Sequence, residues 1–289
     1  MPYKLITDAT SDLPQALAQQ WEVEVLPMDY TLDGQPHRYA PGNTDIPLQD
    51  VFDAMRKGAA AVTSQINTFT FTTAFEKHLA QGLDVIYIGF SSALSGTVAS
   101  ARIAQSELSE KYPGRKIAVV DSLSASLGQG LYVYYAARQQ KALGFEEMTA
   151  WLEAHKYNFV HWFTVDDLEY LKRGGRVSGA TAAIATVLQI KPVMHVDREG
   201  HLVAVEKVQG RKKSLKALVD RMAAAADMEK TDVVFIGHCD ARKDAELVAG
   251  QVRERFNINN IVIDDIGVMI GAHSGPGTVA LFFYGERLK

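Results

Sequence analysis

The stretch Asp84-Val85-Ile86-Tyr87-Ile88-Gly89-Phe90-Ser91-Ser92-Ala93-Leu94-Ser95-Gly96-Thr97 decides the predicted fold. Residues 84–90 have the continuous apolar pattern of a buried strand, and residues 98–108 have a helical pattern. A turn rich in hydroxyls between a strand and a helix places free backbone N–H groups and side-chain hydroxyls at the helix N-terminus. In an open parallel sheet, such a turn lies at the carboxyl edge of the strands, where ligands bind. We therefore expect residues 91–97 to hold a carboxylate or a phosphate.

Strand and helix patterns alternate through the first half of the chain. Strands are predicted over 4–7, 23–32, 84–90 and 116–120, and helices over 13–21, 48–57, 68–81, 98–108 and 128–143. Alternation of this kind favours parallel strands joined by crossover helices. The N-terminal part is therefore predicted to be a mainly parallel sheet with flanking helices.

The second half has a different pattern. Segments 193–197 and 201–208 flank Arg198-Glu199-Gly200 and predict an antiparallel hairpin. Further strands are predicted over 160–165, 233–238, 260–264 and 279–284, helices over 166–172, 177–188, 215–226 and 241–256, and a glycine-rich loop over 267–277. The chain of 289 residues is also long for a single core. We expect two domains, an N-terminal α/β domain over 1–157 and a C-terminal mixed α/β domain over 158–289.

Composition excludes several classes of function. A net charge of −4 and a pI of about 6.1 argue against nucleic acid, which needs a basic face. The one cysteine, Cys239, excludes an internal disulfide framework and indicates a reducing compartment. The chain starts without a signal-peptide pattern, and no apolar run reaches the roughly 18 residues that span a bilayer. We expect a cytoplasmic protein without stable membrane insertion.

Four further segments carry polar groups in predicted loops. Thr63-Ser64-Gln65 is either a ligand site or an N-cap for the helix after it. The hydroxyls between Asp121 and Gly130 lack the spacing of a phosphate-binding loop, so capping and close packing explain them better. The basic run Lys172-Arg173-Gly174-Gly175-Arg176 is either an anion site or a solvated helix end. His273, in His273-Ser274-Gly275-Pro276-Gly277-Thr278, is either structural or functional.

The chain contains, in this order, Ile6-Thr7-Asp8-Ala9-Thr10-Ser11-Asp12-Leu13-Pro14, Thr63-Ser64-Gln65, Ser91-Ser92-Ala93-Leu94-Ser95-Gly96-Thr97, Leu168-Glu169-Tyr170-Leu171-Lys172-Arg173-Gly174-Gly175-Arg176, Lys191-Pro192, Gly210-Arg211-Lys212-Lys213 and His273-Ser274-Gly275-Pro276-Gly277. Taken together, these motifs and their order resemble the DegV family of fatty-acid-binding proteins. One departure is Ile66-Asn67, where many members have Pro-Ser. The resemblance extends from about residue 4 to about residue 285.

The resemblance implies that a long-chain fatty acid lies in a tunnel between the two domains. It also implies that the carboxylate is presented to a separate ATP-dependent fatty acid kinase subunit, which makes an acyl phosphate. The implied ligand-binding residues are Thr63 and Ser95 for the carboxylate, His273 in the polar network around it, Ser64, Ser92 and Gly96 beside them, and Arg211 near the opening. Arg173 and Arg176 are implied as surface residues that dock the kinase. No catalytic residue, cofactor or metal is expected in this chain.

Two enzymatic alternatives stay open. A serine-dependent acyl hydrolase would use Ser95 and His273, but Ala93 stands where a nucleophile elbow has its first glycine. Such an enzyme also needs an acidic group, Asp8 or Asp264, to orient the histidine. A metallohydrolase would be built from His238, Asp240, Asp264, Asp265 and His273, which lack a tight metal-ligand spacing.

Overall fold

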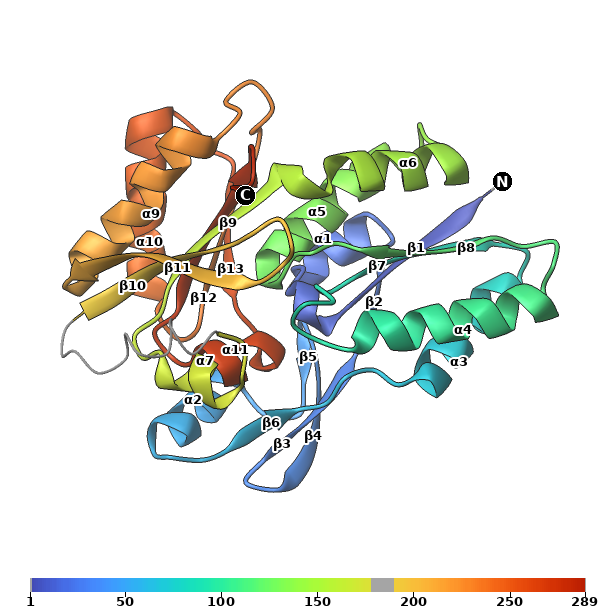
Figure 1. Cartoon of the computed structure of the whole chain (residues 1–289), viewed down its shortest axis with the longest axis horizontal. Helices are drawn as coiled ribbons and strands as arrows, with labels where there is room; N and C mark the ends of the chain where they lie inside the picture. The colour runs from blue at the N-terminus through green and yellow to red at the C-terminus, as the bar shows by residue number, and fades with distance from the viewer. Residues whose placement is uncertain (1, 178–189, 289) are drawn as a thin grey trace.

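The computed structural model describes residues 2–177 and 190–288, and its strands form three sheets (Figure 1). The first sheet has the order β2-β1-β7-β8 and consists of β1 (Tyr3–Asp8), β2 (Glu24–Leu26), β7 (Asp84–Gly89) and β8 (Ile117–Asp121). All of its pairings are parallel. The parallel sheet predicted for the N-terminal part is therefore confirmed.

The second sheet was not anticipated from the sequence. It is antiparallel, in the order β5-β4-β3-β6, and consists of β3 (Met28–Leu32), β4 (Gln35–Ala40), β5 (Asn43–Thr44) and β6 (Ala61–Thr63). Asp33 and Gly34 both have positive φ, 49° and 79°, as a tight two-residue hairpin turn requires. Asp-Gly is a frequent pair in such turns, and here it leads from β3 into β4.

The third sheet is mixed, in the order β11-β10-β9-β14-β12-β13. It consists of β9 (Phe159–Thr164), β10 (Ile190–Val196), β11 (Leu202–Gln209), β12 (Val234–His238), β13 (Ile261–Asp265) and β14 (Val279–Tyr284). The pair β12–β13 is parallel and the other pairings are antiparallel, including the predicted hairpin of β10 and β11.

Ten α-helices accompany the sheets in the described residues. They are α1 (Gln15–Gln20), α2 (Leu48–Arg56), α3 (Thr68–Leu79), α4 (Thr97–Lys111), α5 (Ser126–Gln139), α6 (Phe145–His155), α7 (Glu169–Arg173), α9 (Arg211–Ala225), α10 (Arg242–Phe256) and α11 (Val268–Ser274). Short 3-10 turns occupy Ala9–Ser11 and Lys156–Asn158. Helix α6 was not predicted, and the helix expected over 177–188 lies, apart from Val177, outside the described residues.

Helix α11 replaces part of the loop expected over 267–277. Its glycines weaken the helical pattern in the sequence, but Val268, Met269 and Ala272 are buried on the side of the helix that faces the core. The backbone N–H of Gly267 donates to Oδ1 of Asp12 at 3.0 Å, which holds the start of the helix. His273 consequently lies on the last turn of a helix, where its position is set by regular structure.

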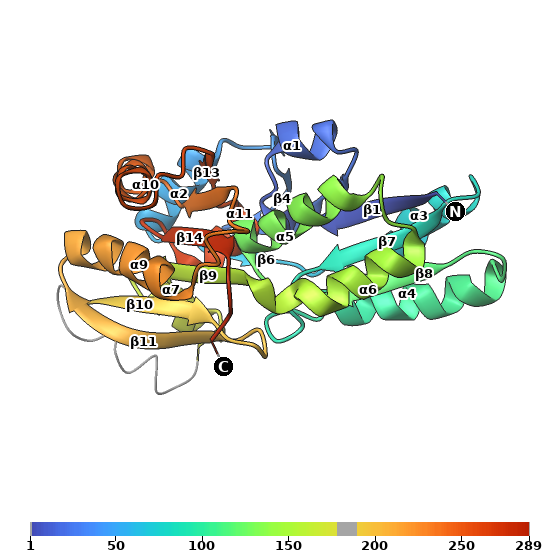
Figure 2. The ribbon, with the colours of Figure 1, turned by 90° about the horizontal axis from the view of Figure 1, so that it is seen from above.

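The two faces of the third sheet pack against different neighbours. In β14, Val279, Leu281 and Phe283 belong to one buried cluster with α9 and α10, whereas Ala280, Phe282 and Tyr284 belong to the core shared with the N-terminal strands. Side chains of a strand point alternately to opposite faces, so β14 separates the two cores. Figure 2 shows α9 and α10 at one end of the molecule and the first sheet with α4 at the other.

The strands of the first two sheets precede residue 122, and those of the third follow residue 158. The helices do not separate so cleanly, since α5 packs on β9, β12 and β14 of the third sheet. The domain boundary at residue 157 therefore stays a prediction.

Candidate functional site

A cavity of about 340 Å³ lies between the carboxyl end of the first sheet and the inner face of the third. Its lining comes from both halves of the chain and is mainly apolar: Met28, Phe90, Leu94, Phe163, Leu171, Val196, Leu202, Ile266, Met269, Ile270, Ala280 and Phe282. Polar groups are fewer: Thr10, Thr63, Ser64, Gln65, Ser95, Ser126, His161, Arg176, His273, Ser274 and Thr278. An apolar cavity with a few convergent polar groups is typical of a small-molecule site.

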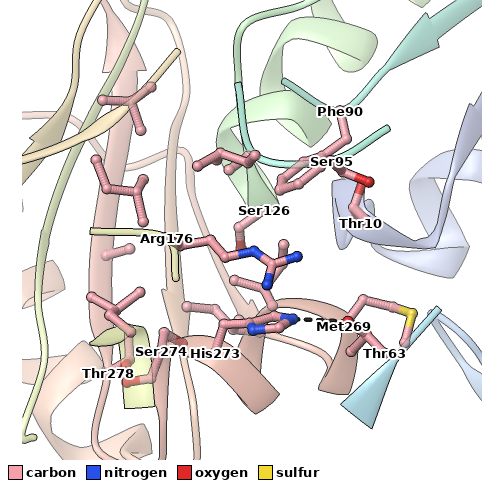
Figure 3. A pocket seen from close by; sticks show the side chains of 18 of the residues that line it. Thr10, Thr63, Phe90, Ser95, Ser126, Arg176, Met269, His273, Ser274 and Thr278 are labelled. Carbon is pink, nitrogen blue, oxygen red and sulfur yellow. Dashed lines mark hydrogen bonds between the residues drawn. The ribbon is translucent and has the colours of Figure 1, made fainter. Parts of the chain in front are cut away.

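Thr63 and His273 are in direct contact at the cavity wall. Thr63 ends β6, and its Oγ1 lies 2.8 Å from Nε2 of His273 on the last turn of α11 (Figure 3). The other side of the imidazole packs on Gly174, where an added Cβ would lie 2.6 Å from Nδ1. Burial lowers the pKa of His273 from 6.5 to about 4, and the positive charge of Arg176 acts in the same direction. The imidazole is therefore neutral at neutral pH.

Ser95 lies in the turn that links β7 to α4, as the sequence predicts. The N–H groups of Leu94 and Ser95 donate to the carbonyl of Ser91 at 3.0 and 3.2 Å, and Ser95 Oγ lies 3.0 Å from Oγ1 of Thr97. Gly96 directly precedes α4, and an added Cβ there would collide with the side-chain oxygen of Gln65. The side chain of Gln65 thus lies against the turn, and Thr63, Ser64 and Ser95 line one cavity.

Arg176 was expected on the surface beside Arg173, and the structure corrects that placement. Gly175 has a φ of 68°, and the N–H of Arg176 bonds back to the carbonyl of Leu171 at 3.1 Å, which reverses the chain after α7. The Arg176 side chain therefore extends into the cavity beside His273 (Figure 3) and bonds to the carbonyl of Gly174. Arg173 is exposed, as expected, with its guanidinium 4.7 Å from the centre of the Tyr170 ring.

Two other predicted ligand-binding residues do not line the cavity. The Arg211 guanidinium is 2.7 Å from Asp244, donates to the carbonyl of Gly277 at 2.5 Å and lies 3.7 Å from Asp166. It therefore fixes the position of Gly277, which precedes the cavity residue Thr278. Ser92 is exposed, and its backbone N–H donates to Asp121 at 3.2 Å.

Thr10 and Ser126 also line the cavity; Ser126 is one of the hydroxyls between Asp121 and Gly130 that the sequence assigns to capping and packing, and Thr10 was not predicted as a site residue. Thr10 Oγ1 donates to the buried Asp8 and lies 3.0 Å from Gln129 Oε1. Ser126 Oγ donates to Asp12 at 2.7 Å. Burial raises the pKa of both carboxyl groups. Thr10 lies two residues after the carboxyl end of β1, where ligands bind in a parallel sheet, so the argument used for the β7–α4 turn also applies to it.

The catalytic arrangements considered from the sequence are not assembled in the described part of the chain. His273 bonds to Thr63 and Ser95 bonds to Thr97, and no hydrogen bond joins Ser95 to His273. Asp8 bonds to Thr10 and Tyr87. Residues 2–177 and 190–288 contain no group of three or more His, Cys, Asp or Glu placed to hold a metal ion. Nor does any helix in these ranges have the length and apolar character needed to cross a bilayer.

The fold and the cavity define a class of mixed α/β proteins with a mainly apolar cavity between two sheets. A family model described as "Uncharacterised protein, DegV family" matches residues 2–286. A DegV domain-containing protein of Clostridium perfringens is 41% identical over 287 residues, 98% of each chain. Another, YteA of Lactococcus lactis, is 32% identical over 294 residues, 100% of each chain. The chain therefore belongs to the DegV family.

Solved structures agree with this assignment. A fatty-acid-binding DegV family protein from Thermus thermophilus is 31% identical, with a TM-score of 0.86 over 99% of this chain and 100% of that one. A protein from Thermotoga maritima, described as revealing a fatty acid binding function, is 26% identical, with a TM-score of 0.83 over 99% of both chains. A fatty-acid-binding DegV protein from Streptococcus agalactiae is 27% identical, with a TM-score of 0.84 over 99% and 100%.

Proposed function

We propose that this protein binds one long-chain fatty acid in the cavity, with its carboxylate beside Thr63, Ser95 and His273. The observation that carries the proposal is the direct contact of Thr63 and His273 at the wall of a largely apolar cavity. A buried carboxylate needs several hydrogen-bond donors, which two hydroxyls and a neutral imidazole supply, and the guanidinium of Arg176 beside His273 adds a positive charge. The fatty-acid-binding relatives with the same fold support this assignment.

Most of the affinity would come from the acyl chain. Burial of one methylene contributes about 0.8 kcal/mol, so a chain of roughly fifteen methylenes contributes on the order of 12 kcal/mol before the entropic costs of binding. Ala280 and Phe282 of β14 and Phe163 of β9 form the apolar wall for that chain. The polar cluster then sets the orientation of the ligand more than its affinity.

We further propose that the bound carboxylate is presented to a separate kinase subunit. The neutral donors Thr63, Ser95 and His273 leave a carboxylate more nucleophilic than a bidentate arginine pair would, and the guanidinium of Arg176 in the same cavity already donates to the carbonyl of Gly174. A carboxylate oxygen would attack the γ-phosphorus of ATP on the partner, the bond from phosphorus to the ADP oxygen would break, and an acyl phosphate would form. This chain would bind and orient the carboxylate without catalysing the transfer. Arg173 is exposed and is therefore our candidate for docking the kinase subunit.

The test is a binding titration with oleate on protein freed of lipid, comparing the wild type with Thr63→Val. Valine keeps the shape of threonine and removes the donor. A hydrogen bond to a charged group contributes about 1.5–3 kcal/mol, so we expect at least about tenfold weaker binding. Thr73→Val is the matched control, since Thr73 is exposed and its hydroxyl bonds only within α3. Equal affinity of Thr63→Val and wild type would place the carboxylate elsewhere.

A further inference from the structure

Asp12 is a buried carboxyl group at which three chain segments meet. It is 2% exposed, and it follows the 3-10 turn Ala9–Ser11 in a left-handed conformation with a φ of 46°. Its Oδ2 accepts a hydrogen bond from Oγ of Ser126 at 2.7 Å, and its Oδ1 accepts one from the backbone N–H of Gly267 at 3.0 Å. One side chain thus satisfies a donor from each half of the chain.

All three segments contribute side chains to the fatty-acid cavity. Thr10 lies in the 3-10 turn, Ser126 begins α5, and Gly267 directly precedes α11, which carries His273. Figure 3 shows Thr10, Ser126 and His273 around the same cavity. Gly267 has no side chain that could cap α11, so the Asp12 carboxyl supplies the acceptor at the start of this helix.

The position of His273 depends on where α11 begins. The helix has only seven residues, and His273 lies on its last turn, with Nε2 2.8 Å from Oγ1 of Thr63. A shift that moved the ring about 1 Å away from Thr63 would leave no hydrogen bond between them. The bond between Asp12 and Gly267 therefore bears on the polar contact at which we place the ligand carboxylate.

We propose that Asp12 is a positioning residue for fatty-acid binding, which fixes the start of α11 and thereby places His273 beside Thr63. The inference rests on the function proposed above. Asp12 does not belong to the described lining of the cavity, so its effect on the ligand passes through the residues that it holds. Burial raises the pKa of its carboxyl group well above the usual value, and the charges of Asp264 and Asp265 act in the same direction. A neutral side chain of the same shape should therefore serve at this position.

Oleate titrations of lipid-free protein test the proposal through double-mutant cycles. Asp12→Ala removes both acceptors and should weaken oleate binding about tenfold. In the His273→Gln background the same change should cost less than about threefold, because the ring that Asp12 positions is already absent. In the Ser95→Ala background it should still cost about tenfold, since the hydroxyl of Ser95 bonds to Thr97 within the β7–α4 turn, away from the groups that Asp12 holds.

Asp33→Ala is the matched control. Asp33 is an exposed aspartate in the β3–β4 turn with a φ of 49°, and its carboxylate accepts the N–H of Ala60 at 2.8 Å, so this variant also loses a bond at a left-handed position. It should bind oleate as the wild type does. Asp12→Asn keeps an acceptor for Gly267 and should stay within about threefold of the wild-type affinity. If Asp12→Ala does not fold, Asp12→Glu takes its place in the cycles, because the added methylene would displace α11 while the carboxyl group is retained.

Two results would overturn the positioning role. One is an oleate affinity of Asp12→Ala equal to that of the wild type, and the other is an effect of equal size in the wild-type and His273→Gln backgrounds. Wild-type protein that takes up no oleate would instead contradict the proposed function, and the inference with it. The two failures are therefore distinguishable.

Discussion

Thr63 and His273 are 210 positions apart in the chain, and their side chains meet at 2.8 Å. The contact joins the last strand of the antiparallel sheet to the last turn of α11. It therefore depends on both halves of the chain being folded and packed. A carboxylate placed there would be held by groups from both sides of the cavity, so ligand binding should stabilise the assembled protein.

The pH dependence of stability should report the burial of His273. Its pKa is about 4 in the folded protein and 6.5 when unperturbed, so the unfolded chain binds more protons between these values. The contribution of the neutral His273 imidazole to the free energy of unfolding is therefore fully present above about pH 6.5. It decreases as the pH drops toward about 4, by up to about 3 kcal/mol. Urea unfolding of the lipid-free protein at a series of pH values measures this loss. The variant His273→Gln should have a smaller loss, and an equal loss would assign the effect to other groups.

Gly174 should be intolerant of a side chain because of its contact with the imidazole. An added methyl group would lie 2.6 Å from Nδ1 of His273, so Gly174→Ala should displace the ring and weaken oleate binding. Gly250→Ala is the matched control, since Gly250 lies within α10 with open space around its Cα. We expect Gly250→Ala to leave oleate affinity unchanged and to raise stability by up to about 1 kcal/mol. Equal oleate affinity in both variants would mean that the ring position does not matter.

Arg287 should be the most destabilising arginine to remove. It is 1% exposed, and its guanidinium donates to the carbonyls of Phe159 and Leu123 and to Oγ of Ser124. These bonds tie the C-terminal segment to β9 and to the loop after β8. Arg287→Met should lower the free energy of unfolding by about 3 kcal/mol or more, because several buried carbonyls lose their donor. Exposed Arg173→Met should change it by less than about 0.5 kcal/mol, and a similar loss in both variants would refute this assignment.

Substitutions of Arg176 and of Arg173 should affect two different functions. Arg176 extends into the cavity, so Arg176→Met should change oleate affinity in lipid-free protein. Arg173 is exposed, so Arg173→Glu should leave oleate affinity unchanged and slow acyl-phosphate formation by a kinase subunit. Binding titrations and a coupled assay with the kinase measure the two effects. If Arg173→Glu bound oleate more weakly and Arg176→Met did not, the two assignments would be wrong.

Much of the fold follows from local patterns. Alternating strand and helix patterns predicted the parallel sheet, and Arg198-Glu199-Gly200 predicted the β10–β11 hairpin, because periodicity and turn chemistry are local properties. The small antiparallel sheet was missed because β4 is polar and largely exposed, so it lacks an apolar run. Helix α11 was missed because glycine and proline near it indicate a loop, and only its buried side shows why it is helical.

Less of the candidate site could be predicted from the sequence alone. The β7–α4 turn was predicted from local pattern, but the assignment of Thr63 and His273 to one polar network came from the family resemblance, since no local signal joins residues so far apart. The inward direction of Arg176 depends on the positive φ of Gly175, and the sequence shows two adjacent glycines without showing which way the chain turns. The family resemblance implied that Arg211 lies near the opening, and its partners Asp166 and Asp244 could not be recognised because they are distant in sequence.

We propose that this protein carries a long-chain fatty acid, and native mass spectrometry of the purified protein tests this function most directly. We predict one equivalent of bound ligand, which lipid extraction after denaturation identifies as a long-chain fatty acid. Protein purified without ligand should take up one equivalent of added oleate. A protein that is empty and fails to take up oleate would contradict the account.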